Sequence, residues 1–451
     1  MAMRWETLLS RRRLGKREVD AAVSARTDFQ RDFDRIVFSS AFRRLQDKTQ
    51  VFPLAGNDYV RTRLTHSLES SSVGRSLGTL VGERIIARHR LGRDVDPSDF
   101  GAIVAAACLS HDIGNPPFGH LGEDAICEWF ASSPLGQRVL EQLTPAERLD
   151  LARFEGNAQG FRILARLQSR DNPGGLQLTA ATLGAFTKYP RGSTAAGQGQ
   201  GASAKKHGYF ADDAALFAEV AETLALLPRG EGAWCRHPLA FLVEAADDIC
   251  YRVIDLEDSY RVGLLEYREV HDLLRAVVAE PDLDRRLAGI RGPKERIEYL
   301  RARAINSIIL QVTESFMEHE AAMLEGRFDA SLLDHIPAAP AVQGLLEIAM
   351  ARIYVAPQVM EVEAAGFEVL GGLLEAFVAA AEEVAAHGAR AASRSRVFLR
   401  LIPEQFIGSA TAPEPAAYRR LLGITDFVSG MTDSYAVTLY KRIKGISLPQ
   451  R

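Results

Sequence analysis

Long hydrophobic runs are missing from this sequence of 451 residues. No stretch of 18 consecutive apolar residues occurs, so we expect no membrane-spanning helix. The N-terminal sequence MAMRWETLLSRRRLGKRE also has no apolar core of the kind that a secretory signal needs. These two absences predict a cytoplasmic protein that does not enter a membrane.

Cysteine is scarce as well. The chain has four cysteines, at positions 108, 127, 235 and 250, and no pair has CxxC spacing. This excludes a disulfide-dense scaffold. Three of the four lie among apolar residues, so we interpret the cysteines as reduced thiols in the core of a cytosolic protein.

A large excess of charge of either sign is absent too. The 54 Lys and Arg nearly balance the 58 Asp and Glu, giving a net charge of −4. A generally basic nucleic-acid binder is therefore not expected, although a local basic patch stays open. The 47% hydrophobic fraction excludes disorder throughout the chain. The length allows roughly two to four domains or one large helical unit.

Strand-type alternation is rare, and helical periodicity runs through most of the chain. One apolar series steps mostly by four residues, as on one face of a helix: Leu64, Leu68, Val73, Leu77, Val81 and Ile85. Asp99 can cap a second helix, which must end at the break Gly114-Asn115-Pro116-Pro117. A further helix should begin at Pro238 and run to about Gly263, and others should cover 341–353 and 366–387. These patterns predict an all-α fold.

One segment breaks the helical pattern. Residues 191–208, RGSTAAGQGQGASAKKHG, are rich in small residues and show no periodicity. We expect a flexible surface loop within a folded unit. Its Lys205 and Lys206 are either solvated charges or contacts to a phosphate or nucleic acid.

The segment 110–123, SHDIGNPPFGHLGE, carries the strongest chemical signal. His111 and Asp112 lie at the end of a predicted helix, where free carbonyl groups and the helix dipole favour a cation. An adjacent imidazole and carboxylate can share a divalent ion. A second pair, His271-Asp272, lies in an ordinary helical stretch, and we interpret it as a chance pair.

Two more ligands are needed for such an ion, and His66 and Asp247 are the candidates. A lone histidine near an apolar face is usually a core residue, but Arg61 and Arg63 directly before His66 favour a site for phosphate. A carboxylate within the apolar helix around Asp247 is costly unless it is paired or binds a metal. Two histidines and two aspartates suit Mn²⁺ or Mg²⁺, with Fe²⁺ as a further candidate.

Seven segments together resemble a known family: RDFDRIVFSSAFRRLQDKTQVF (31–52), RLTHSLE (63–69), HDIGNPPFGHLGE (111–123), FEGNAQGFRIL (154–164), LTAATLGAFTKYP (178–190), EAADDICYRVIDLED (244–258) and GMTDSYA (430–436). They are similar to the HD-domain phosphohydrolases and, more narrowly, to the shorter branch of the deoxyguanosinetriphosphate triphosphohydrolase (dGTPase) family. The resemblance implies an all-α HD-domain fold with additional C-terminal helices. It also implies hydrolysis of a dNTP to a deoxynucleoside and inorganic triphosphate.

His120 and Glu123 are three residues apart at the start of the next predicted helix, so they can share a face. Glu123 can hold one ring nitrogen of His120 while the other faces the substrate, an arrangement that suits acid or base catalysis. The resemblance gives both residues catalytic roles. The alternative is a pair that caps the helix.

The remaining site residues concern the nucleotide. Arg63 shares a helix face with His66, and by resemblance it contacts the phosphates. Arg43 and Lys188 are further candidates for the phosphates, although each could be a solvated surface charge. The resemblance places Tyr251 near the phosphates and Asp255 near the sugar 3′-hydroxyl. A tyrosine ring packed under the deoxyribose would clash with a 2′-hydroxyl, and the alternative for Tyr251 is a core residue.

Three polar residues complete the set. Gln46 is a candidate for the sugar, and Asn157 matches a family position without a role that we can derive. Asn115 stands where some relatives have histidine, so a second metal or a phosphate-binding imidazole is not predicted there. The asparagine can still donate a hydrogen bond.

The sequence thus predicts a metal-dependent dNTP triphosphohydrolase with an N-terminal arm and HD core over 1–265 and a helical region over 266–451 packed on that core. We expect a homo-oligomer and leave single-stranded DNA or a nucleotide effector open as partners. One alternative is another HD phosphohydrolase that acts on nucleoside monophosphates or cyclic nucleotides. A second is a nucleotide or single-strand sensor without turnover.

Overall fold

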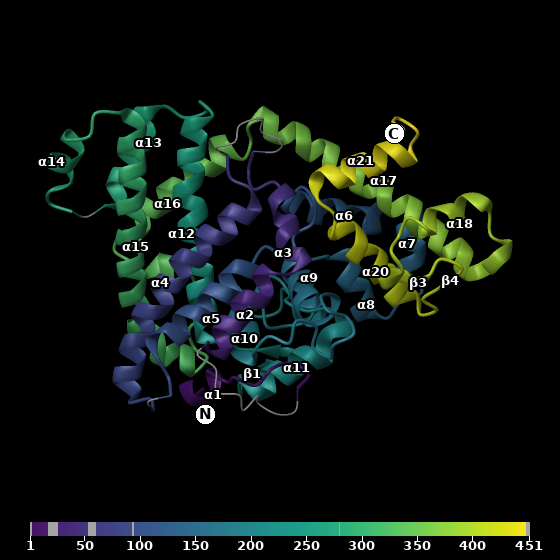
Figure 1. Cartoon of the computed structure of the whole chain (residues 1–451), viewed down its shortest axis with the longest axis horizontal. Helices are drawn as coiled ribbons and strands as arrows, with labels where there is room; N and C mark the ends of the chain where they lie inside the picture. The colour runs from purple at the N-terminus through teal and green to yellow at the C-terminus, as the bar shows by residue number, and fades with distance from the viewer. Residues whose placement is uncertain (1, 17–25, 53–59, 93, 279, 448–451) are drawn as a thin grey trace.

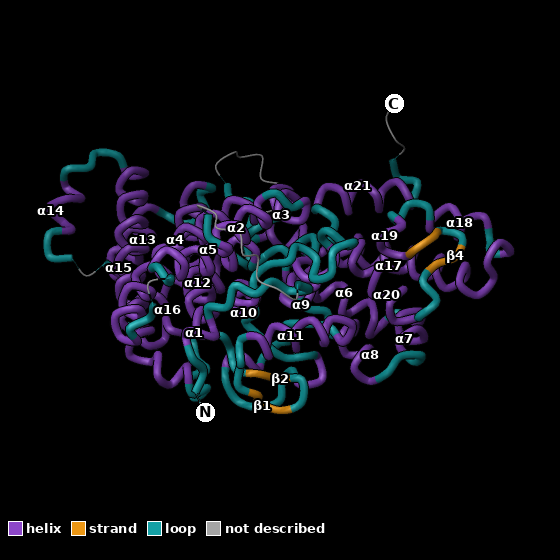
Figure 2. The backbone as a smooth tube through the Cα atoms, turned by 60° about the horizontal axis from the view of Figure 1, so that its bottom comes forward, coloured by secondary structure: helices purple, strands orange, loops and turns teal. Residues whose placement is uncertain are grey.

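The computed structural model describes residues 2–16, 26–52, 60–92, 94–278 and 280–447. In these residues the fold is all-α, as predicted, and the β-strands form two small ribbons (Figure 2), besides a few isolated bridges. The ribbons pair β1 (Pro228–Gly230) with β2 (Ala233–Trp234), and β3 (Gly408–Ser409) with β4 (Ala412–Pro413).

The helices of the first half of the chain are α1 (Trp5–Leu8), α2 (Asp28–Val37), α3 (Ser40–Arg44), α4 (Arg63–His89), α5 (Pro97–Ser110), α6 (His120–Ser132), α7 (Pro134–Leu140), α8 (Pro145–Ala152), α9 (Gly156–Arg162), α10 (Ala180–Phe186) and α11 (Ala214–Thr223). Those of the second half are α12 (Pro238–Arg261), α13 (Tyr267–Val277), α14 (Leu283–Ala288), α15 (Pro293–Leu324), α16 (Ala339–Ile348), α17 (Pro357–His387), α18 (Ser393–Leu399), α19 (Glu404–Ile407), α20 (Ala417–Ser429) and α21 (Asp433–Ile443).

Two hydrophobic clusters form the core. The first joins α2, α4 and α5 to α12, α13 and α15, and the second joins α6 and α7 to α17, α20 and α21. Figure 1 shows α12, α13 and α15 at one end of the molecule and α18 and α20 at the other, with α4 and α5 nearer the first end. The short segment 111–119 connects α5 in the first cluster to α6 in the second. The division of the chain at residue 265 stays a prediction.

The predicted helices are present, but two of them start elsewhere: the helix predicted over 366–387 begins at Pro357, and the cap of α5 differs. Asp96, not Asp99, is the N-cap of α5: its carboxylate accepts the Ser98 N–H at 2.8 Å. Asp99 lies at the third helical position and accepts the Asp96 N–H in return. Both acids belong to one reciprocal capping box. From the sequence pattern alone, either of them could be taken as the N-cap.

Close packing of α4 on α5 brings two distant histidines together. A Cβ atom at Gly78 of α4 would lie 2.6 Å from the Phe100 carbonyl oxygen, and one at Gly74 would lie 2.5 Å from the Cys108 sulfur. Only glycine permits this approach. The start of α4, with His66, therefore lies beside the end of α5, where His111 follows.

One described helical span, Pro357–Arg390, is long and apolar enough to cross a membrane by length and composition. Half of its most apolar window is buried within the molecule, and α17 packs against α6, α18 and α20. The core helix of a soluble protein has the same properties, so we keep the expectation of no membrane insertion.

The segment 191–208 makes more internal contacts than its composition predicts. Ser203, His207 and Arg191 are buried, and short 3-10 turns cover Ser193–Ala195 and Ala202–Ala204. The Arg191 guanidinium donates to the carbonyl oxygens of Ala195 and Gln198. This segment is therefore tied to itself and to the body of the protein.

Candidate active site

The four predicted metal ligands converge from three helices. Single ligand atoms of His66, His111 and Asp112 all lie within 4.8 Å of one another. Asp247 of α12 joins them, because its Oδ1 lies 3.1 Å from Nε2 of His66 and 3.2 Å from Nε2 of His111. Each imidazole therefore presents the same nitrogen to the centre of the cluster.

His111 is held in one tautomer by the end of its own helix. Its Nδ1 lies 2.6 Å from the Cys108 carbonyl oxygen, which can only accept a hydrogen bond, so Nδ1 carries the proton. When the ring is neutral, as a metal ligand must be, Nε2 is then left with a lone pair. This atom is buried and has no partner with hydrogen-bond geometry among the described residues.

Each carboxylate of the cluster uses one oxygen to bind a basic side chain. Oδ2 of Asp112 accepts from Arg63 at 2.7 Å, and Oδ2 of Asp247 accepts from Lys188 at 2.8 Å. The other oxygens face the imidazoles, and Asn115 donates to Oδ1 of Asp112 at 2.6 Å. Arg63, Lys188 and Asn115 thus orient the predicted ligands.

The charges at this site favour positive charge between the carboxylates. Burial alone would raise the pKa of Asp112, but Arg63 and then His111 lower it below its usual range. Asp247 behaves in the same way, with Lys188 as the main cause of its lowered pKa. For His111, burial acts against the charged form, yet Asp112 and Asp247 raise its pKa to about 9.

These residues fit a divalent cation. The buried, unpartnered Nε2 of His111 is aimed at the centre of the cluster, and a second imidazole nitrogen and two carboxylate oxygens surround the same point. Mixed nitrogen and oxygen ligands without thiolate suit Mn²⁺, Fe²⁺ or Mg²⁺. A metal-binding histidine usually donates its other ring N–H to a protein acceptor, as Nδ1 of His111 does to the Cys108 carbonyl oxygen.

His120 and Glu123 form a second pair beside the cluster. Nδ1 of His120 lies 3.3 Å from Oε2 of Glu123, whose other oxygen accepts the Gly156 N–H at 2.9 Å. The side chain of His120 is 74% exposed, while that of Glu123 is 9% exposed. The hydrogen bond to Glu123 raises the pKa of His120. A buried acid therefore orients an imidazole that stays accessible.

Lys206, from the segment 191–208, also reaches Glu123. Its Nζ lies 3.6 Å from Oε2 of Glu123 and 3.0 Å from Oε2 of Glu155. Burial would raise the pKa of Glu123, but His120 first and then Lys206 lower it. Of the two lysines in that segment, Lys206 contacts the catalytic candidates, whereas Lys205 is exposed.

A cavity of about 410 Å³ adjoins Arg63 and His120. Apolar side chains from α17 and the turn before it cover one side, and the lining residues are Thr49, Gln50, Val51, Arg63, Phe118, Gly119, His120, Leu121, Met350, Tyr354, Val359, Val362 and Glu363. The Tyr354 hydroxyl donates to Oδ2 of Asp255 at 2.7 Å, and burial raises the pKa of Asp255 to about 8. Asp255, which was predicted to lie near the sugar 3′-hydroxyl, is thus connected to the cavity wall through Tyr354.

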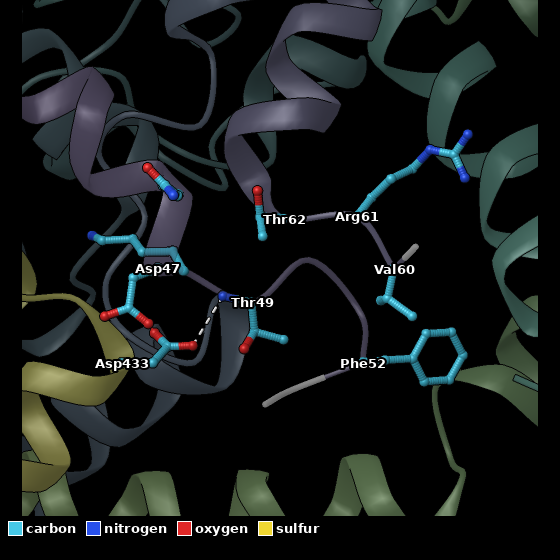
Figure 3. Close-up of a pocket in the computed structure, with 9 residues that line it drawn as sticks. Asp47, Thr49, Phe52, Val60, Arg61, Thr62 and Asp433 are labelled. Atoms are coloured by element: carbon cyan, nitrogen blue, oxygen red, sulfur yellow. Dashed lines mark hydrogen bonds between the residues drawn. The ribbon is translucent and has the colours of Figure 1, made fainter. Parts of the chain in front are cut away.

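Gln50 lines this cavity, whereas the predicted Gln46 does not. Gln46 is exposed and lines a smaller cavity of about 130 Å³ with Lys48 and Thr49 (Figure 3). The helical turn ends at Asp47, after which the extended chain carries Gln50 along the larger cavity. Oε1 of Gln50 is buried without a hydrogen-bond partner among the described residues. Sequence reasoning missed Gln50, although it lies in the segment that carries the family resemblance.

The other predicted residues lie on three different helices, α12, α9 and α3. Tyr251 is half-buried on α12, where its hydroxyl accepts from Arg252 at 3.3 Å. Asn157 donates to Glu155 at 2.6 Å at the start of α9, and Arg43 is exposed on α3. The pair His271-Asp272 lies on α13 with an exposed aspartate, outside the cluster.

Comparisons with known proteins agree with the resemblance. Residues 335–442 match the family model described as a phosphohydrolase-associated domain. A deoxyguanosinetriphosphate triphosphohydrolase-like protein of Synechocystis is 46% identical over 99% of this chain and all of its own length. A protein of the same name from Pseudomonas aeruginosa is 42% identical over 99% of the chain and all of its own length. A deoxyguanosinetriphosphate triphosphohydrolase of Salmonella enteritidis is 31% identical over 93% of the chain and 94% of its own length.

Proposed function

The chain belongs to the deoxyguanosinetriphosphate triphosphohydrolase family, and from that premise we propose that it hydrolyses dGTP and other dNTPs to a deoxynucleoside and inorganic triphosphate. The reaction requires a divalent metal ion, Mn²⁺ or Mg²⁺ or alternatively Fe²⁺. We further propose that the protein acts in the cytoplasm as a homo-oligomer, with single-stranded DNA or a nucleotide as its effector.

One observation carries the proposal. The Nε2 atom of His111 is buried and has no partner with hydrogen-bond geometry among the described residues, yet it faces Oδ1 of Asp247 and the ring of His66, and in the neutral ring it offers its lone pair to that point. An unpaired polar atom in this position would cost stability unless a ligand completes it. A divalent ion bound there supplies Lewis-acid stabilisation of the phosphoryl oxygens.

The basic residues of the site bind and orient. Arg63 and Lys188 hold Oδ2 of Asp112 and of Asp247 and bring positive charge to the edge of the cluster. Arg63 also lines the 410 Å³ cavity, so it can contact a phosphate that enters from there. The triphosphate charge is met locally by these side chains, although the whole chain is slightly acidic.

His120 is assigned the proton transfer. Its Nδ1–H donates to Oε2 of Glu123, which leaves Nε2 as the atom that exchanges a proton with the reacting groups. In the reaction, the oxygen of water bonds to the α-phosphorus, the bond from that phosphorus to the 5′-oxygen breaks, and the 5′-oxygen takes up a proton. Glu123 fixes the ring, because Gly156 holds its second oxygen.

The cavity is assigned to the deoxynucleoside. Its apolar wall suits a base and a sugar, and Gln50 offers an unpaired amide oxygen. Tyr251 and Asp255 lie on α12 four and eight residues after Asp247, and Tyr354 connects Asp255 to the cavity wall. We therefore assign Tyr251 and Asp255 to recognition of the deoxyribose.

Product analysis tests the function. The protein is incubated with each dNTP and Mn²⁺, and the products are separated by ion-exchange chromatography. A deoxynucleoside and triphosphate in equal amounts are expected. Phosphate released from nucleoside monophosphates, without dNTP turnover, would instead support another HD phosphohydrolase, and dNTP binding without turnover would support a sensor.

A further inference from the structure

The side chain of Asp433, the first residue of α21, connects two segments that are remote in sequence. Oδ2 accepts the Thr49 N–H at 2.9 Å (Figure 3), and Oδ1 accepts the Phe118 N–H at 3.0 Å. The residue is 3% exposed. Both oxygens of one buried carboxylate are thus used to hold the backbone of two different loops.

These loops form walls of the 410 Å³ cavity. Thr49 and Phe118 line it, as do the residues that follow them, Gln50, Gly119 and His120. Asp433 therefore lies directly behind the segment that presents His120 and behind the segment that presents Gln50. Its own side chain is not among the residues that line this cavity.

The loop before His120 needs such support, because its backbone is strained. Phe118 has a φ of +65°, in the left-handed region that is unfavourable for any residue with a Cβ atom. Gly119 follows at +64°, and a Cβ atom there would lie 2.4 Å from Nη2 of Arg63. The loop is bent tightly against Arg63, and the hydrogen bond to Asp433 stabilises the bend.

Lys48 makes a second connection to the same part of the molecule. Its buried Nζ donates to the Asn115 carbonyl oxygen and, at 3.0 Å, to the Ser429 carbonyl oxygen at the end of α20. The junction of α20 and α21 thus contacts the 45–49 segment twice, through the Ser429 carbonyl oxygen and through the Asp433 carboxylate. This junction belongs to the region that matches the phosphohydrolase-associated model.

We propose that Asp433 is a positioning residue through which the C-terminal helices set the placement of His120 and Gln50. The inference rests on the proposed function, because it takes His120 as the group that transfers the proton. It assigns a role to the segment GMTDSYA, which otherwise lies outside the site. Asp433 acts by holding two backbone amides and does not touch the substrate.

Kinetics of Asp433→Asn test the proposal. The amide has nearly the same volume but offers one acceptor where the carboxylate offers two, so one of the two N–H groups loses its partner. We expect kcat to fall on the order of 10²-fold, since a misplacement of about 1 Å has effects of that size. Metal content should equal that of the unsubstituted protein. Ser434→Ala, the next position of α21, is the matched control: its hydroxyl donates to the exposed Asp47 side chain and not to the Thr49 or Phe118 backbone, so kcat should be unchanged.

A double substitution separates positioning from a general loss of structure. His120→Ala alone should lower kcat by about 10²–10⁴-fold. If Asp433 acts partly through His120, adding Asp433→Asn to that variant should lower kcat by a much smaller factor than in the protein with His120, because only the placement of Gln50 is then left to lose. Independent, multiplying losses would overturn the proposal, as would full activity of Asp433→Asn.

Amide hydrogen exchange on the unsubstituted protein tests the contacts without any variant. The Thr49 and Phe118 amides should exchange slowly, like amides within α6. Rapid exchange at both would overturn the proposal even if Asp433→Asn did not fold. A protein that hydrolyses no dNTP would contradict the proposed function instead, whereas slow exchange would still support the role of Asp433 in holding the loops.

Discussion

Nζ of Lys188 lies 2.8 Å from Oδ2 of Asp247, so this oxygen is already paired and only Oδ1 faces the two imidazoles. Arg63 holds Asp112 in the same way, at 2.7 Å. The pairing explains how two buried carboxylates can stay ionised beside each other. It also fixes which oxygen of each is presented to a metal ion.

Asp247→Ala should remove one anionic ligand and abolish hydrolysis. Metal content measured by elemental analysis should fall in parallel. His271→Ala is the control, because that histidine lies on α13 outside the cluster. Turnover by this variant should be nearly unchanged. Full metal occupancy with normal turnover in Asp247→Ala would contradict the assignment of this carboxylate as a ligand.

Lys206→Met should move the pH profile of kcat. The cation of Lys206 lowers the pKa of His120, as Arg63 also does, whereas Glu123 raises it. Without Lys206 the pKa of His120 should be higher, so the limb of the profile that reports His120 should move to higher pH. Lys205→Met, at the exposed neighbour, should leave the profile in place. An unmoved profile in Lys206→Met would show that the lysine does not influence His120.

Stability should decrease on acidification because of His237, the N-cap of α12. Its Nδ1 accepts the Leu239 N–H at 3.0 Å and its Nε2 donates to the Leu8 carbonyl oxygen, so the ring must be neutral. Burial lowers its pKa from 6.5 to about 4. As the pH falls below 6.5 the unfolded chain takes up a proton that the folded chain does not. The free energy of unfolding should then decrease by about 2 kcal/mol between pH 7 and pH 5 from this group.

Denaturant unfolding of His237→Asn at both pH values measures that contribution. The stability difference between this variant and the unsubstituted protein should become smaller at pH 5, because asparagine does not titrate. His271→Asn, at a partly exposed histidine of α13, serves as the control. An unchanged difference at the two pH values would show that His237 is not the cause.

Tyr251→Ala should weaken discrimination between deoxyribose and ribose. If the ring packs against C2′ of the bound sugar, removing it makes room for a hydroxyl. We expect the ratio of kcat/KM for dGTP over GTP to fall by an amount on the order of 1–3 kcal/mol. Steady-state kinetics with both nucleotides measure the ratio. An unaltered ratio would move the selection to another residue, with Gln50 as the next candidate.

The helices and the ligand cluster could be predicted because their signals are local. Periodic apolar residues, proline at helix starts and the Gly-Asn-Pro-Pro break each lie within a few neighbouring positions. His111 and Asp112 are adjacent in the chain. His66 and Asp247 were candidates from their own sequence surroundings, and the family resemblance supports the four residues as a set.

The residues that support His120 and line the cavity could not be predicted, because their contacts join residues that are remote in sequence. Asp433 accepts hydrogen bonds from Phe118 and Thr49, which are more than 300 positions away in the sequence. No local pattern near residue 433 predicts these two contacts. Gln50 was missed because the helical turn ends at Asp47, which changes the direction of the chain before it reaches the cavity. Lys206 lies in a segment whose composition is typical of a loop, although the fold holds it against Glu155.

Hydrolysis of a dNTP in ¹⁸O-labelled water tests the central claim most directly. If water bonds to the α-phosphorus and the 5′-oxygen leaves, mass spectrometry should find one ¹⁸O in the triphosphate and none in the deoxynucleoside. Label in the deoxynucleoside would contradict the account, because it would mean attack at the sugar carbon. Labelled deoxynucleoside monophosphate with pyrophosphate would contradict it as well, because the triphosphate would then not be released whole.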